Sequence, residues 1–385
     1  MAKRRKIGII YEYNENWIGG TYYIENLISA LNTLPEELQP EILVFTENID
    51  QFNNFQKKIK YSLLKRRDYK RKLNLPQRII NKISGSLFKT IPYDYFHHDI
   101  DLVFPGDTMH RFHKRQAFLF WIPDFQEHYL PGFFSQKEIN ARKASQKYIV
   151  ETGENIVFSS QVARDHFNEI YKGNKLNQFV LQFAVTHPDL RGEKNTLIKY
   201  NLSEKYFLCS NQFWQHKNHK VLLESVGQLK RSGYEIKIVF TGKEQDYRAT
   251  NYFNELQVLV KELNIEKEIL FLGFIDREDQ LNLMKNSLAV IQPSLFEGWS
   301  TVIEDAKALN IQIIASDIPV HIEQLADYAK CLTFERNNEK SLGEKLLFVK
   351  NGLNENCTTN DYSKNVYAYG KNFISITESA LQVKI

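Results

Sequence analysis

The chain has 385 residues, a formal net charge of +4, and a composition that is 43% hydrophobic and 25% charged. These values are typical of a soluble globular protein with two domains, each large enough to bury its own core. No run approaches the roughly 20 apolar residues of a membrane-spanning helix, and the apolar stretch after the basic N-terminus is too short for a signal peptide. The cysteines are few and widely spaced, which indicates free thiols in a reducing compartment, so we expect a cytoplasmic protein.

The first predicted strand, at 6–11, is followed by a polar loop, by Gly19-Gly20 and then by an amphipathic helix. Two adjacent glycines let a backbone approach a ligand closely, and Thr21 is a suitable cap for the helix. The loop matches neither the Walker motif nor G-x-G-x-x-G. Taken alone, it is either a phosphate-binding loop or an ordinary turn before a helix.

A strongly basic segment lies at 57–89, where twelve Lys or Arg residues accompany one acid, Asp68. One interpretation is a solvated loop or helix face. A second is contact with an anionic membrane surface on the inner face of the membrane. The chain has no recognisable nucleic-acid-binding module here, so we do not expect a nucleic acid partner. The apolar residues that would insert into the membrane are Ile59, Tyr61, Leu63 and Leu64.

The strand predicted at 117–122 ends in a polar stretch that contains Asp124 and His128. Ligands of open α/β sheets gather at the carboxyl ends of strands, so these side chains are candidates for binding sugar hydroxyls. A polar loop with an Asp cap is the alternative. Asp99 and Asp101 mimic a D-x-D metal motif, but they precede a strand instead of following one. We therefore interpret these two acids as structural.

Beyond a polar segment at 187–201, which resembles an interdomain linker, strands and helices alternate again. Alternation of this kind predicts a parallel sheet, and two such halves predict two Rossmann-like domains of the α/β class. The strands of the second half are predicted at 206–210, 236–241, 269–274, 288–291, 311–315 and 331–334.

Cations cluster after the strand at 206–210, where Lys217 and its neighbours His216 and Lys220 precede a helix. Positive charge at the start of a helix opposes the helix dipole, so this cluster suggests a bound anion. Ordinary surface charge is the alternative.

The most informative stretch is 291–310, which predicts a buried strand, a tight turn and a helix capped by Ser300 or Thr301. The helix N-terminus offers unpaired N–H groups and a positive dipole end, which suit a phosphate. Glu297 lies in the turn, and Asp305 shares a helix face with Thr301. Acids on either side of an anion site suit a nucleotide sugar, whose hydroxyls flank a diphosphate.

This stretch also resembles the signature of retaining glycosyltransferases of the GT-B fold, family 4 (glycosyl transferases group 1). The signature is E-G-(F/W)-x-x-x-x-x-E-A, and the chain has Glu297-Gly298-Trp299 with Asp305-Ala306. Its second acid is therefore Asp305, with Glu304 beside it, and the spacing favours Asp305. The family's Arg-x-x-x-x-Lys appears here with Gln212 in place of the arginine and with Lys217 as the lysine.

The resemblance implies a GT-B protein with two domains facing a cleft. The first would span 1–188 plus a C-terminal helix at 365–385, and the second, which would bind the nucleotide sugar, 202–364. It implies catalytic roles for Glu297, Lys217 and Asp124, with His128 as the alternative at the sugar. The implied donor-binding residues are Gly19, Gly20, Gln212, Gly242, Phe274, Gly298, Trp299, Ser300, Thr301, Asp305 and Glu304.

The implied activity is transfer of a sugar, with retention and without a metal or other cofactor, to a hydroxyl of a glycan or lipid-linked saccharide. Such a reaction belongs to the biosynthesis of cell-surface polysaccharide or lipopolysaccharide. One alternative is another GT-B activity at the same site, an epimerase or hydrolase. The other is a nucleotide-sugar- or glycan-binding protein without turnover, which the departures at Gln212 and Asp305 favour.

Overall fold

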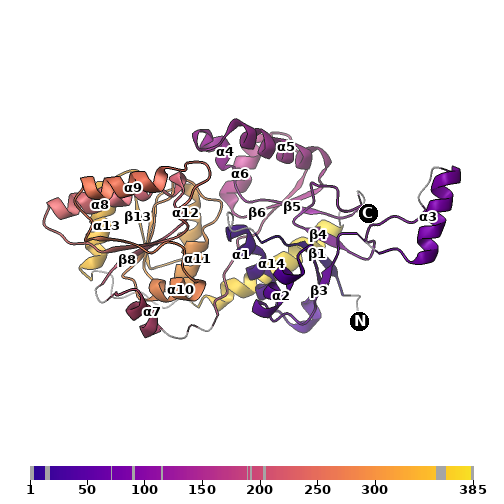
Figure 1. The fold of residues 1–385 in the computed structure, drawn as a ribbon, viewed down its shortest axis with the longest axis horizontal. Helices are drawn as coiled ribbons and strands as arrows, with labels where there is room; N and C mark the ends of the chain where they lie inside the picture. Colours follow the sequence, from indigo (N-terminus) through magenta and orange to yellow (C-terminus); the bar gives the residue numbers. More distant parts are fainter. Residues whose placement is uncertain are drawn as a thin grey trace.

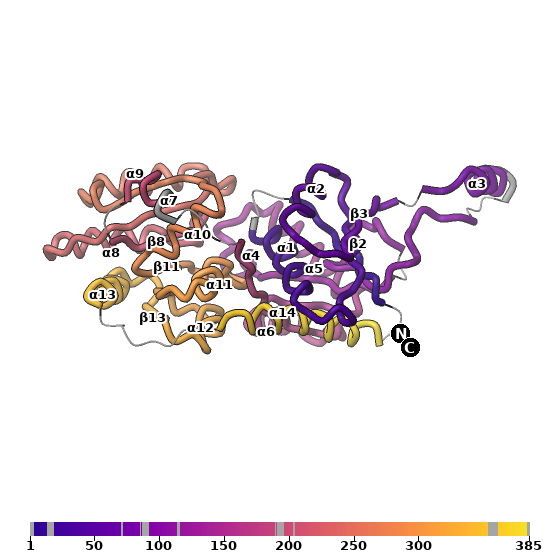
Figure 2. Tube along the Cα trace, turned by 90° about the horizontal axis from the view of Figure 1, so that it is seen from below, coloured from indigo at the N-terminus to yellow at the C-terminus, as the bar shows by residue number. Residues whose placement is uncertain are grey.

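A computed structural model describes residues 4–13, 18–70, 72–88, 92–113, 116–188, 190, 193–202, 205–352 and 361–382. It consists of two α/β domains that lie side by side, with all paired strands parallel (Figure 1). Figure 2 shows the same two bodies from below. Among the described residues, no helix is long and apolar enough to cross a membrane.

The first domain has two neighbouring sheets, ordered β3-β2-β1-β4 and β5-β6-β7, and a bridge between Val103 and Phe118 joins β4 to the start of β5. The strands are buried because apolar runs such as Ile7–Ile9 and Ile42–Phe45 face helices on both sides. The strands are β1 (Lys6–Ile10), β2 (Glu41–Phe45), β3 (Leu64–Arg67), β4 (Leu102–Phe104), β5 (Leu119–Ile122), β6 (Asn155–Phe158) and β7 (Asn177–Val180).

Helices cover both faces of these sheets, and the last helix of the chain is one of them. Helix α14 packs closely on α1, where a Cβ on Gly370 would lie 2.7 Å from the Ala30 carbonyl oxygen. The helices are α1 (Ile18–Leu31), α2 (Ile49–Lys58), α3 (Leu75–Phe88), α4 (Gln126–Tyr129), α5 (Gln136–Thr152), α6 (Gln161–Ile170) and α14 (Ser363–Gln382), with 3-10 turns η2 (Glu36–Leu38) and η3 (Pro131–Phe133).

The second domain has one six-stranded sheet ordered β10-β9-β8-β11-β12-β13. Its strands are β8 (Phe207–Ser210), β9 (Ile238–Thr241), β10 (Ile269–Phe271), β11 (Val290–Gln292), β12 (Ile313–Ser316) and β13 (Cys331–Phe334). Its helices are α7 (Glu193–Lys199), η4 (Gln215–Lys217), α8 (His219–Arg231), α9 (Tyr252–Glu262), α10 (Arg277–Lys285), α11 (Thr301–Ala308), α12 (Pro319–Leu325) and α13 (Glu339–Lys350).

The structure differs from the prediction in two local details. Gly19, Gly20 and Thr21 lie inside the first turn of α1, so the glycines form no separate loop and Thr21 does not cap the helix. The segment predicted as a linker contains α7, which is held to the second domain because Lys199 and Tyr200 both donate hydrogen bonds to Asp279 of α10.

The basic segment also differs from its prediction, since it contains the edge strand β3 and the helix α3. Ile59, Tyr61 and Leu64 are buried in the first domain's core and Leu63 packs against it, so these residues are not available to a membrane. The reason is that their side chains complete the core under β2 and β3.

The exposed apolar residues of this segment lie instead on α3, which stands away from the body of the domain (Figures 1 and 2). Asn81 holds the chain that returns from α3, because its amide donates to the Tyr93 carbonyl and accepts from the Tyr93 N–H. The exposed apolar side chains are Leu75, Ile79, Ile80 and Ile83.

Candidate active site

A cavity of about 840 Å³ lies between the two domains and is lined by both. The first domain contributes the start of α1, the end of β5 and part of α5. The second contributes the segments that follow β8, β9, β10 and β11, together with the first turn of α11. The cavity therefore lies at the carboxyl ends of the second domain's strands, where open parallel sheets bind their ligands.

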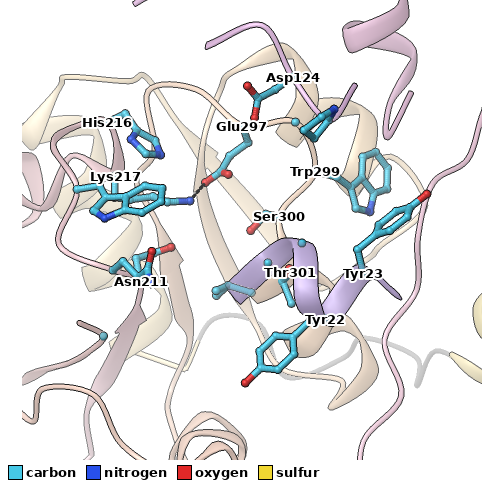
Figure 3. A pocket seen from close by; sticks show the side chains of 18 of the residues that line it. Tyr22, Tyr23, Asp124, Asn211, His216, Lys217, Glu297, Trp299, Ser300 and Thr301 are labelled. Carbon is cyan, nitrogen blue, oxygen red and sulfur yellow. Dashed lines mark hydrogen bonds and ion pairs between the residues drawn. The ribbon is translucent and has the colours of Figure 1, made fainter. Parts of the chain in front are cut away.

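Glu297 is the most heavily bonded acid in the cavity (Figure 3). One of its oxygens, Oε1, accepts hydrogen bonds from Lys217 Nζ at 2.6 Å, Ser294 Oγ at 2.7 Å and Gln292 Nε2 at 2.8 Å. All three donors bind the same oxygen, which leaves Oε2 available to a ligand. Burial alone would raise the pKa of Glu297, but the Lys217 charge and these hydrogen bonds hold that pKa below its usual value.

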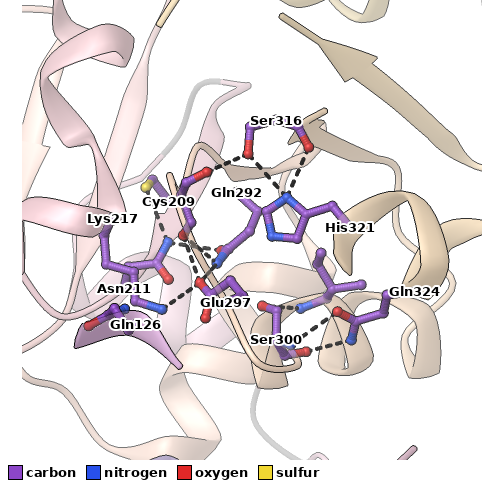
Figure 4. A network of polar contacts seen from close by, with 12 residues as sticks. Gln126, Cys209, Asn211, Lys217, Gln292, Glu297, Ser300, Ser316, His321 and Gln324 are labelled. Carbon is purple, nitrogen blue, oxygen red and sulfur yellow. Dashed lines mark hydrogen bonds and ion pairs between the residues drawn. The ribbon is translucent and has the colours of Figure 1, made fainter. Parts of the chain in front are cut away.

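The polar network behind Glu297 fixes its position (Figure 4). Asn211 Nδ2 donates to Gln292 Oε1 at 3.0 Å, so the ends of β8 and β11 are tied together below the carboxylate. His321 Nδ1 contacts Ser316, whose hydroxyl donates to the Ser294 carbonyl at 2.6 Å. Asn211 itself lines the cavity, whereas Ser316 and His321 support the turn from which Glu297 projects from behind it.

The N-terminus of α11 opens onto the same cavity, and Ser300 is its N-cap. The Ser300 hydroxyl accepts from the Ile303 N–H at 3.3 Å, as expected for a capping serine. Gln324 holds the cap from both sides, because its side chain accepts from the Ser300 N–H and donates to the Ser300 carbonyl. A capped helix N-terminus next to a cation suits an anionic group such as a phosphate.

The two candidates for the second acid lie on different sides of α11. Asp305 lines the cavity, is fully buried, and accepts hydrogen bonds from His187 at 2.9 Å and Arg277 at 2.5 Å. Glu304 does not line the cavity, because Lys307, Gln324 and the Tyr362 hydroxyl bind its carboxylate behind the helix. Of the two candidates, Asp305 is therefore the one that the structure brings to the cavity.

Asp124 faces Glu297 from the first domain, and Figure 3 shows the two carboxylates in one view with Lys217. Burial raises the pKa of Asp124, against the opposing charge of Arg142 at 4.0 Å. His128, the predicted alternative at the sugar, is exposed and is not brought to the cavity lining. Its ring lies against Tyr129 instead.

The two domains are in close contact beside Asp124. A Cβ on Gly298 would lie 2.2 Å from the carbonyl oxygen of Pro123 and 3.1 Å from Asp124 Cβ, so only glycine fits. The next residue, Trp299, crosses to the first domain and donates its indole N–H to the Phe183 carbonyl at 3.2 Å. These contacts set the separation of Glu297 and Asp124.

The other predicted donor-binding residues all line the cavity: Gly19, Gly20, Gln212, Gly242, Phe274, Gly298, Trp299, Ser300 and Thr301. Several lining residues were not predicted, among them Tyr22, Arg142, Arg248 and Arg277. Arg248 is nearly buried between the rings of Phe134 and Trp214, and it donates to Gln126 across the cleft at 3.3 Å. No local motif marks Arg142 or Arg277, because their carboxylate partners Glu127 and Asp305 are 15 and 28 residues away in the sequence.

Within the described ranges, no group of three or more His, Cys, Asp and Glu residues is arranged to hold a metal ion.

The sequence is similar to those of known glycosyltransferases. Residues 195–366 match the family model described as "Glycosyl transferases group 1". An O-antigen chain mannosyltransferase of Salmonella typhimurium is 26% identical over 220 residues, which is 57% of each chain. A Campylobacter jejuni N-acetylgalactosaminyltransferase that acts on a diphospho-undecaprenol-linked substrate is 29% identical over 146 residues, 38% of this chain and 37% of that one. The matches thus span 57% of the length of the first of these curated relatives and 37% of the second.

Solved structures resemble the whole chain. A glycosyltransferase from Rickettsia africae has a TM-score of 0.64 at 16% identity and covers 99% of this chain and 97% of its own. The Anabaena protein HepE, solved with UDP and glucose, has a TM-score of 0.64 at 15% identity over 99% of both chains. These likenesses confirm the predicted GT-B fold.

Proposed function

We propose that the protein is a glycosyltransferase that transfers a sugar from a nucleotide-sugar donor to a hydroxyl of a glycan or lipid-linked saccharide, with retention and without a metal. The observation that carries the proposal is the Glu297–Lys217 pair, which lies beside the capped N-terminus of α11 in the interdomain cavity. The names of the relatives, an O-antigen mannosyltransferase and an enzyme acting on a lipid diphosphate, support a role in surface polysaccharide assembly.

In this proposal the donor's diphosphate lies at the start of α11 and near Lys217. Breaking the bond between the sugar's anomeric carbon and the diphosphate oxygen places negative charge on the leaving group. Lys217 and the N–H groups of the first turn of α11 stabilise that charge. The other oxygen of Glu297, Oε2, accepts hydrogen bonds from hydroxyls of the transferred sugar.

Asp124 positions that sugar from the first domain. The oxygen of the acceptor hydroxyl bonds to the anomeric carbon on the same face of the sugar that the diphosphate leaves, which retains the configuration. The hydroxyl's proton passes to the departing phosphate oxygen. No side chain of the cavity is assigned as a covalent nucleophile in this scheme. Asp124 is the first-domain group that lies opposite Glu297 and Lys217.

We also propose that α3 contacts an anionic membrane surface, which would bring the site close to a lipid-linked acceptor. Leu75, Ile79, Ile80 and Ile83 are exposed on this helix, and Lys72, Arg78 and Lys82 are exposed among or beside them. Exposed apolar side chains interspersed with cations suit the boundary between headgroups and acyl chains.

The proposed activity is tested by incubating the protein with UDP-, GDP- and ADP-sugars, with and without saccharide acceptors, and following the anomeric protons by NMR. We expect transfer or slow donor hydrolysis with one nucleotide, a product of retained configuration, and unchanged turnover in EDTA. Glu297→Gln should lower kcat by about 10²–10³. Glu224→Gln, which alters an exposed Glu–Lys pair, is the matched control. Donor binding without any turnover would instead support a binding protein.

A further inference from the structure

The cavity contains a second carboxylate–cation pair that resembles the first. Arg277, the first residue of α10, donates from Nη2 to Asp305 Oδ1 at 2.5 Å, just as Lys217 donates to Glu297 at 2.6 Å. Both pairs line the cavity, and both carboxylates are essentially buried. Along the chain they flank the α11 N-terminus, since Glu297 precedes the helix and Asp305 lies one turn inside it.

Arg277 retains hydrogen-bonding capacity that the protein does not use. A guanidinium has five N–H donors. Among the described residues, Arg277 uses one on Asp305 and one on Gln280 Oε1 at 2.9 Å. Its guanidinium carbon lies 5.1 Å from the ring centre of Tyr22 in α1, so the ring helps hold the guanidinium in place without using its remaining donors.

The partner carboxylate is also incompletely bonded. Asp305 Oδ2 is buried, has no hydrogen-bond partner in the described structure, and belongs to a residue that lines the cavity. A buried carboxylate oxygen without a donor is costly unless a ligand supplies one. A ligand hydroxyl next to the diphosphate would donate the missing hydrogen bond to Oδ2. Because Arg277 binds the other oxygen of the same carboxylate, it would then lie beside the diphosphate.

The charge of the cavity lining points the same way. Its cations are Arg142, Lys217, Arg248 and Arg277, and its acids are Asp124, Glu297 and Asp305. Arg142 and Arg248 lie near Phe134 of the first domain, with their guanidinium carbons 5.0 and 4.8 Å from its ring centre. Arg277, in contrast, is bound to Asp305 of α11. Gln212, at the position where a family arginine would lie, carries no charge.

We propose that Arg277 binds the diphosphate of the donor and supplies the positive charge that Gln212 lacks. This inference rests on the proposed function, because it assigns a further binding residue of the same nucleotide site. Arg277 and Lys217 then hold the diphosphate from two sides of the α11 N-terminus. Asp305 orients Arg277 with Oδ1 and accepts a ligand hydroxyl with Oδ2.

The test is titration calorimetry of the wild type and Arg277→Gln with UDP, or with GDP or ADP if the wild-type protein prefers one of these. The affinity of each protein for the matching nucleoside is measured by competition against the diphosphate. We expect the variant to lose at least about tenfold in affinity for the diphosphate, as for a hydrogen bond to a charged group. The nucleoside should bind equally well, and the affinity should depend less on salt. Arg231→Gln removes an exposed cation from the end of α8 and is the matched control.

A rescue experiment separates binding from a structural role. Adding Gln212→Arg to the Arg277→Gln variant should restore most of the diphosphate affinity, because the new arginine returns the missing charge. The inference is overturned if Arg277→Gln binds the diphosphate as tightly as the wild type. It is also overturned if diphosphate and nucleoside lose affinity equally and Gln212→Arg restores neither. Absence of nucleotide binding by the wild-type protein would instead contradict the proposed function.

Discussion

Buried histidines near the cavity stay neutral because their surroundings disfavour charge. Burial, together with the nearby charge of Lys217, lowers the pKa of His321 to about 4, although Glu297 acts in the opposite direction. Burial and Lys217 also lower the pKa of His219 to about 3. His321 contacts Ser316 through Nδ1, so its neutral ring helps hold the strand end behind Glu297.

These pKa values predict that the protein loses stability as the pH falls below about 6.5. An unfolded histidine takes up a proton near that pH, whereas folded His321 stays neutral down to about 4. Between these two pH values the unfolded state binds more protons than the folded state. Each such histidine therefore lowers the free energy of unfolding by about 1.4 kcal/mol for each unit by which the pH falls. Urea unfolding of wild type and His321→Asn at pH 6.5 and 5.5 measures this. Equal pH dependence in the two proteins would contradict the prediction.

At the scale of elements, β3 and α3 divide the basic segment into two parts with different roles. The cations of β3 are bound to acids, with Lys65 to Glu41, Arg66 to Asp68 and Arg67 to Asp99. The cations on α3 lie on a helix that projects from the domain. Only the second group is placed to meet a surface that is not part of the chain.

We therefore predict that Arg78→Gln/Lys82→Gln weakens binding to vesicles containing anionic lipid. Two cations near such a surface contribute about 1 kcal/mol each, so the partition coefficient should fall roughly 30-fold. Co-sedimentation with phosphatidylglycerol vesicles measures it. Lys57→Gln/Lys60→Gln removes two exposed cations of the same segment outside α3 and should change the binding much less. Equal effects of the two pairs would locate the contact elsewhere.

The sequence predicted elements best where the pattern was local. The strand–turn–helix at 291–310 could be predicted because one apolar run, one glycine turn and one capping serine are adjacent. Strand β3 was missed because its residues, Leu-Lys-Arg-Arg, hide the apolar pattern, and its cations find acids far away in the sequence. Arg277 escaped notice for the same reason, since its partner Asp305 is 28 residues away.

At the scale of the whole molecule, the site exists only while the two domains are held together. Glu323 of α12 accepts from the N–H groups of Gln161 and Val162 at 2.8 and 3.0 Å, so a residue of the second domain caps α6 of the first. Gly298 provides the second contact by lying directly against Pro123. Both contacts lie between segments that follow β5 and β6 of the first domain and segments that follow β11 and β12 of the second.

Gly298→Ala should therefore separate Glu297 from Asp124. The added methyl would meet the Pro123 carbonyl, and a displacement of about 1 Å at a reacting site can cost on the order of 10²-fold in rate. Transfer kinetics and small-angle scattering would report the loss of activity and a wider cleft. Gly132→Ala meets nothing within 4 Å and serves as the control. Full activity of Gly298→Ala would show that this contact does not set the geometry.

The central claim is that the interdomain cavity binds a nucleoside diphosphate through Lys217 and the α11 N-terminus. The most direct measurement is thermal unfolding of the wild type and Lys217→Gln in the presence of UDP, GDP or ADP. A ligand at a hundredfold excess over its Kd stabilises the folded state by roughly 2.7 kcal/mol. We predict that one diphosphate raises the midpoint of the wild type and raises that of Lys217→Gln far less. An equal rise in both proteins, or no rise with any diphosphate, would contradict the account.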